Sequence, residues 1–289
     1  MSQFSRIGVV GCGLMGSGIA EVCARAGSEV RVVESGEQAL ALGRSRLMAS
    51  LDRGLRAGKL TEAERAAALG RLSFHTALAD LADCDLVIEA VAERLDMKRA
   101  VFKELDGILT DPAAVIASNT SSIPVIELAA VTIRPTQVLG VHFFNPVPVQ
   151  RLIEIIPTQL TDAAVTEQVM NFAADTLGKT AIRARDRAGF VVNALLVPYL
   201  VSAVRMLESG IASAEDIDNG MVLGCAHPMG PLRLLDLIGL DTAQSIAESM
   251  YEEYKEPLYA PPPLLRRMVA AGTLGRKSGQ GFYGYGENP

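Results

Sequence analysis

The sequence predicts an α/β fold in which a mostly parallel β-sheet is followed by an all-helical second domain. Three observations predict it. Buried-strand patterns alternate with helical patterns over residues 1–186, a glycine-rich turn joins the first strand to the first helix, and strand patterns cease after residue 187. Alternating strands and helices usually form a parallel sheet that is covered on both faces, so we expect that arrangement for the first 186 residues.

The expected strands are short runs of apolar residues at 6–10, 29–33, 85–88, 115–117, 138–141 and 152–156. Helical spacing of apolar residues places helices at 14–26, 37–56 and 97–109 among them, and at 190–209, 213–223, 231–238 and 241–254 after them. The change in pattern at residues 186–189 marks the expected boundary, which predicts domains of residues 1–186 and 187–289.

Length and composition indicate an ordinary globular protein. The 289 residues suit two domains, and 49% hydrophobic with 21% charged residues leaves a sizeable core available. The net charge of -6 argues against nucleic acid as a partner, because a polyphosphate is repelled overall. An anionic ligand must therefore be met by local positive charge or by backbone dipoles.

No membrane or disulfide pattern is evident. The N-terminus has no signal-peptide pattern, and the apolar stretch 191–204 is interrupted by Asn193 and Pro198 and is too short to span a bilayer. The four cysteines form no C-x-x-C pair and suggest neither a disulfide framework nor a zinc site. We expect a cytoplasmic protein with no metal and no membrane contact.

A glycine motif follows the first predicted strand. Gly11-Cys12-Gly13-Leu14-Met15-Gly16 matches G-x-G-x-x-G and opens a helix within a β-α-β unit. In that context the first glycine permits a tight turn, the second lets a pyrophosphate approach, and the third lets helix and strand pack closely. The alternative is a plain glycine-rich connector. The motif predicts a Rossmann-type dinucleotide site.

Glu34 follows the second predicted strand, where a carboxylate hydrogen-bonds the adenosine ribose 2′-hydroxyl. A 2′-phosphate at that place would meet like charge, so Glu34 favours NAD over NADP. The alternative interpretation is a surface glutamate.

His142 and Glu154 form the predicted catalytic pair. His142 ends a strand, where ligands bind in open α/β sheets, and Glu154 is a lone carboxylate inside the apolar run Leu152–Ile153–Glu154–Ile155–Ile156. A turn through 145–148 could bring Glu154 beside His142, where it would fix the imidazole tautomer for proton transfer from an alcohol. The alternative is a core histidine bonded to a carbonyl.

Two further segments carry polar groups that could contact a substrate. Residues 118–122, Ser-Asn-Thr-Ser-Ser, follow a strand end and could hold a substrate oxygen or cap a helix. Asn193 lies among apolar residues on a predicted helix, and a substrate carbonyl would satisfy a buried amide there. His75, in a predicted connector, and His227 are interpreted as structural. The default interpretation of three basic residues, Arg53, Arg56 and Lys59, is a solvated helix face.

Together these residues resemble the 3-hydroxyacyl-CoA dehydrogenase family in its short form. The resemblance runs from Ile7 to Tyr283, and its most specific segment is His142-Phe143-Phe144-Asn145-Pro146-Val147-Pro148. It implies that residues 1–186 bind NAD, and that the helical residues 187–289 serve substrate binding and homodimerisation.

The resemblance also implies roles for single residues. His142 and Glu154 match the family's catalytic pair, Ser121 its substrate-oxygen serine and Asn193 its active-site asparagine. The implied cofactor contacts are Gly11, Cys12, Gly13, Leu14, Met15, Gly16, Glu34, Glu93, Lys98 and Lys277.

Two positions depart from the family pattern. Glu34 stands where the family commonly has aspartate, and Ala57 falls on or beside a lysine that contacts coenzyme A. Arg56 or Lys59 would have to replace that lysine, while Ser50 matches a nearby contact.

The predicted activity is NAD-dependent oxidation of a short (S)-3-hydroxyacyl-CoA, or the reverse reduction. Two alternatives stay open: a dehydrogenase of a free hydroxy acid or sugar acid, and a catalytically silent NAD-binding protein.

Overall fold

The computed structural model describes residues 4–286, and the chain divides into two compact units, Met1–Asp186 and Arg187–Pro289. The first, the sheet unit, contains one eight-stranded sheet in the order β3-β2-β1-β4-β5-β6-β7-β8. All neighbouring strands are parallel except β6 and β7, which run antiparallel. The second, the helical unit, follows it. The predicted fold class is confirmed.

The strand order reverses direction about β1, because the chain moves outward to β2 and β3 and then returns to β4. The strands are β1 Arg6–Val10, β2 Glu29–Val33, β3 Leu72–His75, β4 Leu86–Glu89, β5 Val115–Ser118, β6 Val138–Phe143, β7 Leu152–Pro157 and β8 Thr180–Arg183. A ligand crevice forms outside the carboxyl ends of the strands at such a switch point, here between β1 and β4.

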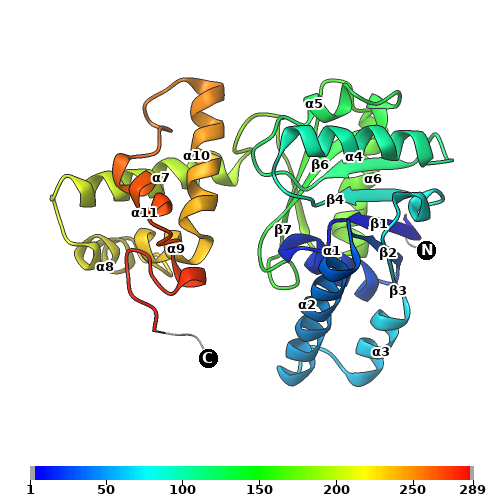
Figure 1. Ribbon diagram of the computed structural model, residues 1–289, viewed down its shortest axis with the longest axis horizontal. Helices are drawn as coiled ribbons and strands as arrows, with labels where there is room; N and C mark the ends of the chain where they lie inside the picture. The colour runs from blue at the N-terminus through cyan, green and yellow to red at the C-terminus, as the bar shows by residue number, and fades with distance from the viewer. Residues whose placement is uncertain (1–3, 287–289) are drawn as a thin grey trace. The chain divides into compact units, whose positions relative to one another are not determined.

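Helices cover both faces of the sheet (Figure 1). On one face α1 (Leu14–Arg25), α2 (Glu37–Arg56) and α6 (Ala163–Asn171) share a core with alternate strand residues, including Ile88, Ala117 and Val141. On the other face, α4 (Leu95–Ile108) and α5 (Ile126–Ala129) lie next to each other. The remaining elements of this unit are α3 Glu62–Gly70, η1 Leu78–Leu81, η2 Pro135–Gln137 and η3 Phe172–Thr176.

The prediction omitted both edge strands, β3 and β8. Each has only four residues, and none of the eight side chains is fully buried. Strands this short and this exposed lack the continuous apolar run that marks an interior parallel strand. The placement of His75 in a connector was therefore wrong, because His75 ends β3.

Over residues 187–286 the helical unit buries its own core between five helices and forms no regular strand, as predicted. The helices are α7 Val192–Glu208, α8 Ala214–Cys225, α9 Pro231–Ile238, α10 Leu240–Tyr254 and α11 Pro263–Ala270, followed by η4 Arg276–Ser278. The buried Asp236 accepts hydrogen bonds from the backbone N–H groups of Phe282 and Tyr283, so it fastens the final segment to α9.

Within residues 4–286, no helix is long and apolar enough to cross a membrane, and no group of three or more His, Cys, Asp or Glu side chains could hold a metal ion. The cysteines are free thiols: Cys12, Cys23, Cys84 and Cys225.

Candidate active site

The glycine loop, residues 11–16, joins β1 to α1. A Cβ at Gly11 would lie 2.7 Å from the carbonyl oxygen of Ala90, and one at Gly16 would lie 1.8 Å from the carbonyl oxygen of Gly11. A Cβ at Gly13, in contrast, would meet nothing within 4 Å. Gly11 and Gly16 are thus required for close packing, while the space above Gly13 is open to a ligand.

The N-terminus of α1 suits an anion. Gly13 caps the helix without a side-chain hydrogen bond, and the first turn contains no acidic residue. The N–H groups and the helix dipole at this end therefore remain available to a pyrophosphate. A dinucleotide fits the loop.

Glu34 lies beside the glycine loop. Its Oε2 accepts a hydrogen bond of 2.8 Å from the backbone N–H of Cys12, and its Oε1 accepts one of 2.8 Å from the N–H of Ser35. Cys12 presents only its backbone to the crevice, because its thiol is buried against Gly43 of α2. Burial, and then the charge of Glu34, raise the pKa of this thiol to about 11.

His142 and Glu154 are direct cross-strand partners in the antiparallel β6–β7 pair. Nδ1 of His142 lies 2.7 Å from Oε2 of Glu154, which is fully buried. A carboxylate can only accept, so this contact places the proton of the neutral imidazole on Nδ1 and the lone pair on Nε2. The predicted proximity of the two side chains is confirmed.

The turn between β6 and β7 makes the pairing possible. The N–H groups of Val149 and Gln150 both donate to the carbonyl of Pro146 at 2.9 Å, which reverses the chain. The Phe144 ring lies 4.6 Å from the His142 ring, and Oδ1 of Asn119 accepts the N–H of Phe143 at 2.8 Å. The end of β6 is thus tied to the residue that follows β5.

Four polar side chains share one face of the sheet near its carboxyl edge. Glu89, Ser118, His142 and Glu154 alternate with Ile88, Ala117, Val141 and Ile153, which belong to the apolar core on the opposite face. Because successive strand residues point to opposite faces, these four lie on the side of α4 and α5. The polar and ionisable side chains at this edge of the sheet are therefore gathered on one face.

The serine loop, residues 119–122, is gathered around one carboxylate. Oε1 of Glu93 accepts the N–H of Ser121 at 3.0 Å, the N–H of Ser122 at 3.2 Å and the hydroxyls of Thr120 and Ser122. Burial acts to raise the pKa of Glu93, but the Lys98 charge and these hydrogen bonds outweigh it, so the pKa lies below its usual value. Ser121 itself is half-buried, and its backbone is fixed by Glu93.

Lys98 of α4 is almost wholly buried, at 1% exposure. Its ammonium lies 2.6 Å from Oε1 of Glu89 and 3.2 Å from Oε2 of Glu93. We call Glu89, Glu93 and Lys98 the acid–lysine network. Sequence reasoning missed Glu89, although it ends an apolar strand, which is the same signal that identified Glu154.

Two implied site residues belong to the helical unit. Asn193 lies on the predicted helix, in the first turn of α7, and is half-buried rather than buried. The Lys277 ammonium is paired with the Asp241 carboxylate at 2.5 and 2.6 Å. His227 lies beside Tyr199, with 3.1 Å between Nδ1 and the phenol oxygen.

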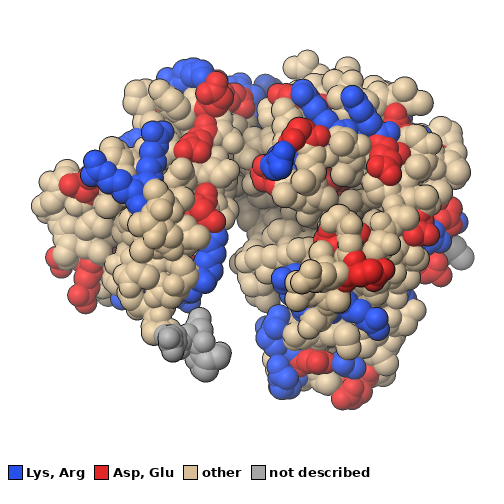
Figure 2. Space-filling model, viewed as in Figure 1, with Lys and Arg blue, Asp and Glu red and all other residues tan. Residues whose placement is uncertain are grey.

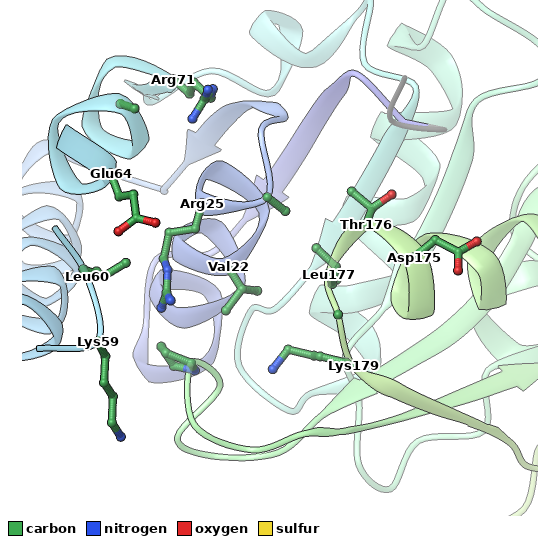
Figure 3. Close-up of a pocket in the computed structure, with 14 residues that line it drawn as sticks. Val22, Arg25, Lys59, Leu60, Glu64, Arg71, Asp175, Thr176, Leu177 and Lys179 are labelled. Carbon is green, nitrogen blue, oxygen red and sulfur yellow. The ribbon is translucent and has the colours of Figure 1, made fainter.

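Basic side chains gather where α2 ends, and Figure 2 shows them at this end of the sheet unit. Arg56 and Lys59 are exposed, while Ser50 lies beside Glu21 of α1. Lys59 borders a cavity of about 540 Å³ that Arg25, Arg71 and Lys179 also line (Figure 3). Burial and the nearby Arg25 charge lower the pKa of Lys179, so positive charge is crowded here.

Comparison with known proteins identifies the family. A sequence description of the 3-hydroxyacyl-CoA dehydrogenase NAD binding domain matches residues 6–187, and that of the C-terminal domain matches residues 189–285. The chain belongs to the 3-hydroxyacyl-CoA dehydrogenase family. The predicted resemblance and the predicted NAD cofactor are confirmed.

Individual relatives agree with this assignment. A 3-hydroxybutyryl-CoA dehydrogenase of Mycobacterium tuberculosis is 59% identical over 97% of this chain and 98% of its own length. A probable 3-hydroxybutyryl-CoA dehydrogenase of Bacillus subtilis is 45% identical over 99% of both chains. The crystal structure of M. tuberculosis FadB2 superimposes with a TM-score of 0.96, at 59% identity, over 98% of this chain and 99% of that chain. That of (S)-3-hydroxybutyryl-CoA dehydrogenase PaaH1 from Ralstonia eutropha gives 0.92, at 45% identity, over 98% and 100%.

Proposed function

We propose that this member of the family interconverts an (S)-3-hydroxyacyl-CoA of short chain, such as 3-hydroxybutyryl-CoA, and the corresponding 3-oxoacyl-CoA with NAD. The observation that carries the proposal is the 2.7 Å contact between His142 and Glu154 at the carboxyl edge of a sheet that also carries a dinucleotide loop. Relatives with names of this activity cover nearly the whole chain, which supports the choice of substrate.

His142 would act as the base. With its Nδ1 proton held by Glu154, Nε2 accepts the proton of the 3-hydroxyl as the C3–H bond breaks, and Glu154 stabilises the resulting imidazolium. When bound, NAD supplies the nicotinamide ring that accepts the hydride from C3. The glycine loop would hold the pyrophosphate and Glu34 the adenosine ribose, with Glu93, Lys98 and Lys277 as further cofactor residues.

Ser121 and Asn193 would hold substrate oxygens. The backbone of Ser121 is positioned by Glu93, so its hydroxyl is presented from a fixed loop. Asn193 would supply an amide from the first turn of α7.

The coenzyme A end of the substrate would be met by basic residues at the end of α2. Ala57 provides no charge, so Lys59 and Arg56 replace the family's lysine, and Ser50 contributes a hydroxyl. Arg25 and Lys179, which line the same cavity as Lys59, add positive charge within reach of phosphate groups (Figure 3).

The helical unit would also form a homodimer. Large apolar side chains are exposed on it, among them Leu195 at 75% and Leu223 at 82%, and an exposed apolar surface of this kind favours association. We expect a dimer by light scattering and a cytoplasmic protein by cell fractionation. A monomer at micromolar concentration would contradict the first expectation.

The activity is tested by following NADH absorbance with acetoacetyl-CoA. Oxidation of NADH that requires the thioester, with little turnover of free acetoacetate, is the expected result. Turnover of the free acid alone would favour a hydroxy-acid dehydrogenase. Binding of NADH without turnover of either compound would indicate a catalytically silent protein.

A further inference from the structure

The acid–lysine network carries more negative than positive charge. Two carboxylates, Glu89 and Glu93, share one ammonium, Lys98, and Glu89 and Lys98 are 0% and 1% exposed. A buried charge is weakly screened by salt and solvent, so an imbalance here acts over a longer distance than one at the surface.

The hydrogen bonds around Glu89 are those of a carboxylate that accepts from three donors. Its Oε1 accepts from Lys98 and from the N–H of Val91, and both of these groups can only donate. Its Oε2 lies 2.7 Å from the hydroxyl of Ser118, whose oxygen already accepts the N–H of Thr120. The Ser118 hydroxyl proton can therefore point at Oε2 of Glu89.

The position of the network relative to the reaction follows from strand register. Glu89 pairs with Ser118, which pairs with Gly140, two residues before His142 on β6. Strands lie about 4.8 Å apart and rise about 3.3 Å per residue, so Glu89 lies roughly 12 Å from His142 on the same face. A substrate carbon beside His142, and the ring that exchanges hydride with it, would then lie on the same face of the sheet as this network.

The fold would place the nicotinamide half of the cofactor on the same side. The adenosine ribose is assigned to Glu34 after β2, and a dinucleotide crosses the switch point between the two halves of the sheet. Its other half would then lie over the carboxyl ends of β4 and β5, where Glu89 ends β4 and the serine loop begins after β5.

From this juxtaposition we propose that Glu89 raises the affinity of the protein for NAD⁺ relative to NADH. The net negative acid–lysine network stabilises the oxidised, cationic nicotinamide more than the reduced, neutral one. Glu89 is a positioning and electrostatic residue, since Lys98 and the loop after β4 separate it from the crevice. The inference rests on the proposed function only for the identity of the cofactor. It concerns the ratio of two cofactor affinities and requires no turnover.

The test is a fluorescence titration of the full-length protein with NAD⁺ and with NADH. Glu89→Gln is expected to raise the ratio of the NAD⁺ to the NADH dissociation constant by about tenfold, the size of one unit charge acting over roughly 10 Å at an effective dielectric constant of about 20. Asp106→Asn is the matched control. It removes another buried carboxylate from the same unit, paired with Arg134 toward the far end of α4, and is expected to leave the ratio unchanged.

Several results of this titration would overturn the inference about Glu89. A folded Glu89→Gln variant with the wild-type ratio overturns the inference, as does an equal change in Asp106→Asn. If Glu89→Gln does not fold, Glu93→Gln replaces it, since it removes one negative charge from the network while keeping the Glu89–Lys98 ion pair; the ratio should rise in the same direction, and an unchanged ratio overturns the inference. Wild-type protein that binds neither cofactor would overturn the proposed function itself, which is a distinct result.

Discussion

His142 and Glu154 touch because they occupy the same register position on two antiparallel strands. Cross-strand partners have Cβ atoms about 5 Å apart, so the imidazole and the carboxylate meet without any special distortion of the backbone. The contact therefore depends on the turn at 145–150, which sets the register, as much as on the two side chains. Any change that shifts this turn by one residue would send Glu154 to the opposite face.

Replacement of His142 tests the base directly. His142→Gln preserves polarity but provides no proton acceptor of suitable basicity, so kcat for acetoacetyl-CoA reduction and for 3-hydroxybutyryl-CoA oxidation should fall roughly a hundredfold or more. The dissociation constant of NADH, measured by fluorescence, should stay within about twofold. Near-normal turnover would remove His142 from the mechanism.

Replacement of Glu154 tests the orientation of the ring. Glu154→Gln can present its amide to Nδ1, which favours the tautomer with the proton on Nε2, so kcat is expected to fall by roughly 10- to 100-fold with little change in KM. NMR of ¹⁵N-labelled histidine would report the tautomer. Loss of activity without a change of tautomer would show that Glu154 acts in another way.

How much the sequence can predict is clearest in the sheet unit. The helix Glu37–Arg56 has the predicted bounds because its apolar residues keep helical spacing over 20 residues. The His142–Glu154 contact was predictable because a carboxylate inside an apolar strand requires a partner. These inferences depend on local pattern, which the sequence contains.

Features that depend on distant neighbours were not predictable. β3 and β8 owe their strand conformation to pairing at the sheet edges rather than to apolar patterning. The burial of Lys98 follows from Glu89 and Glu93 and not from its helix, since a lysine on an amphipathic helix is normally exposed. The carboxylate of Glu89 gave a signal, but its partners could not be identified before the strands were placed.

Replacement of Glu34 tests the selectivity for NAD over NADP. In Glu34→Arg, the carboxylate that accepts the Cys12 N–H is lost and a cation takes its place, so affinity for the 2′-phosphate of NADP should increase. We expect the ratio of kcat/KM for NADH to that for NADPH to fall at least about tenfold. An unchanged ratio would show that Glu34 does not face the ribose. Glu37→Arg, on the exposed first turn of α2, is the control for a general charge effect.

Glu93 makes a pH-dependent contribution to stability. Its pKa is lowered in the folded protein, so its ionised form stabilises the fold above the unfolded-state pKa of about 4.3, and this stabilisation is lost as the pH falls through the lower folded-state pKa. Glu93→Gln should lower the melting temperature at pH 7 by roughly 2–4 °C, equivalent to about 1 kcal/mol. The difference from wild type should shrink between about pH 5 and pH 3.

The comparison at several pH values separates charge from packing. A melting-temperature difference that is constant with pH would mean that Glu93 acts through shape and hydrogen bonding alone. Glu62→Gln, on the exposed first turn of α3, should change the melting temperature little at any pH.

Replacement of Lys59 tests whether this residue binds the coenzyme A end of the substrate. It is exposed and borders a cavity lined by Arg25 and Lys179, and Ala57 cannot supply the charge (Figure 3). Lys59→Ala should therefore raise KM for acetoacetyl-CoA by about three- to tenfold while kcat stays near wild type, because a lost phosphate contact weakens binding of ground state and transition state equally. The increase should diminish at high salt, since the contact is screened. Lys103→Ala, an exposed lysine of α4 on the other face of the sheet, should leave KM unchanged, and an equal effect there would assign the change to net charge.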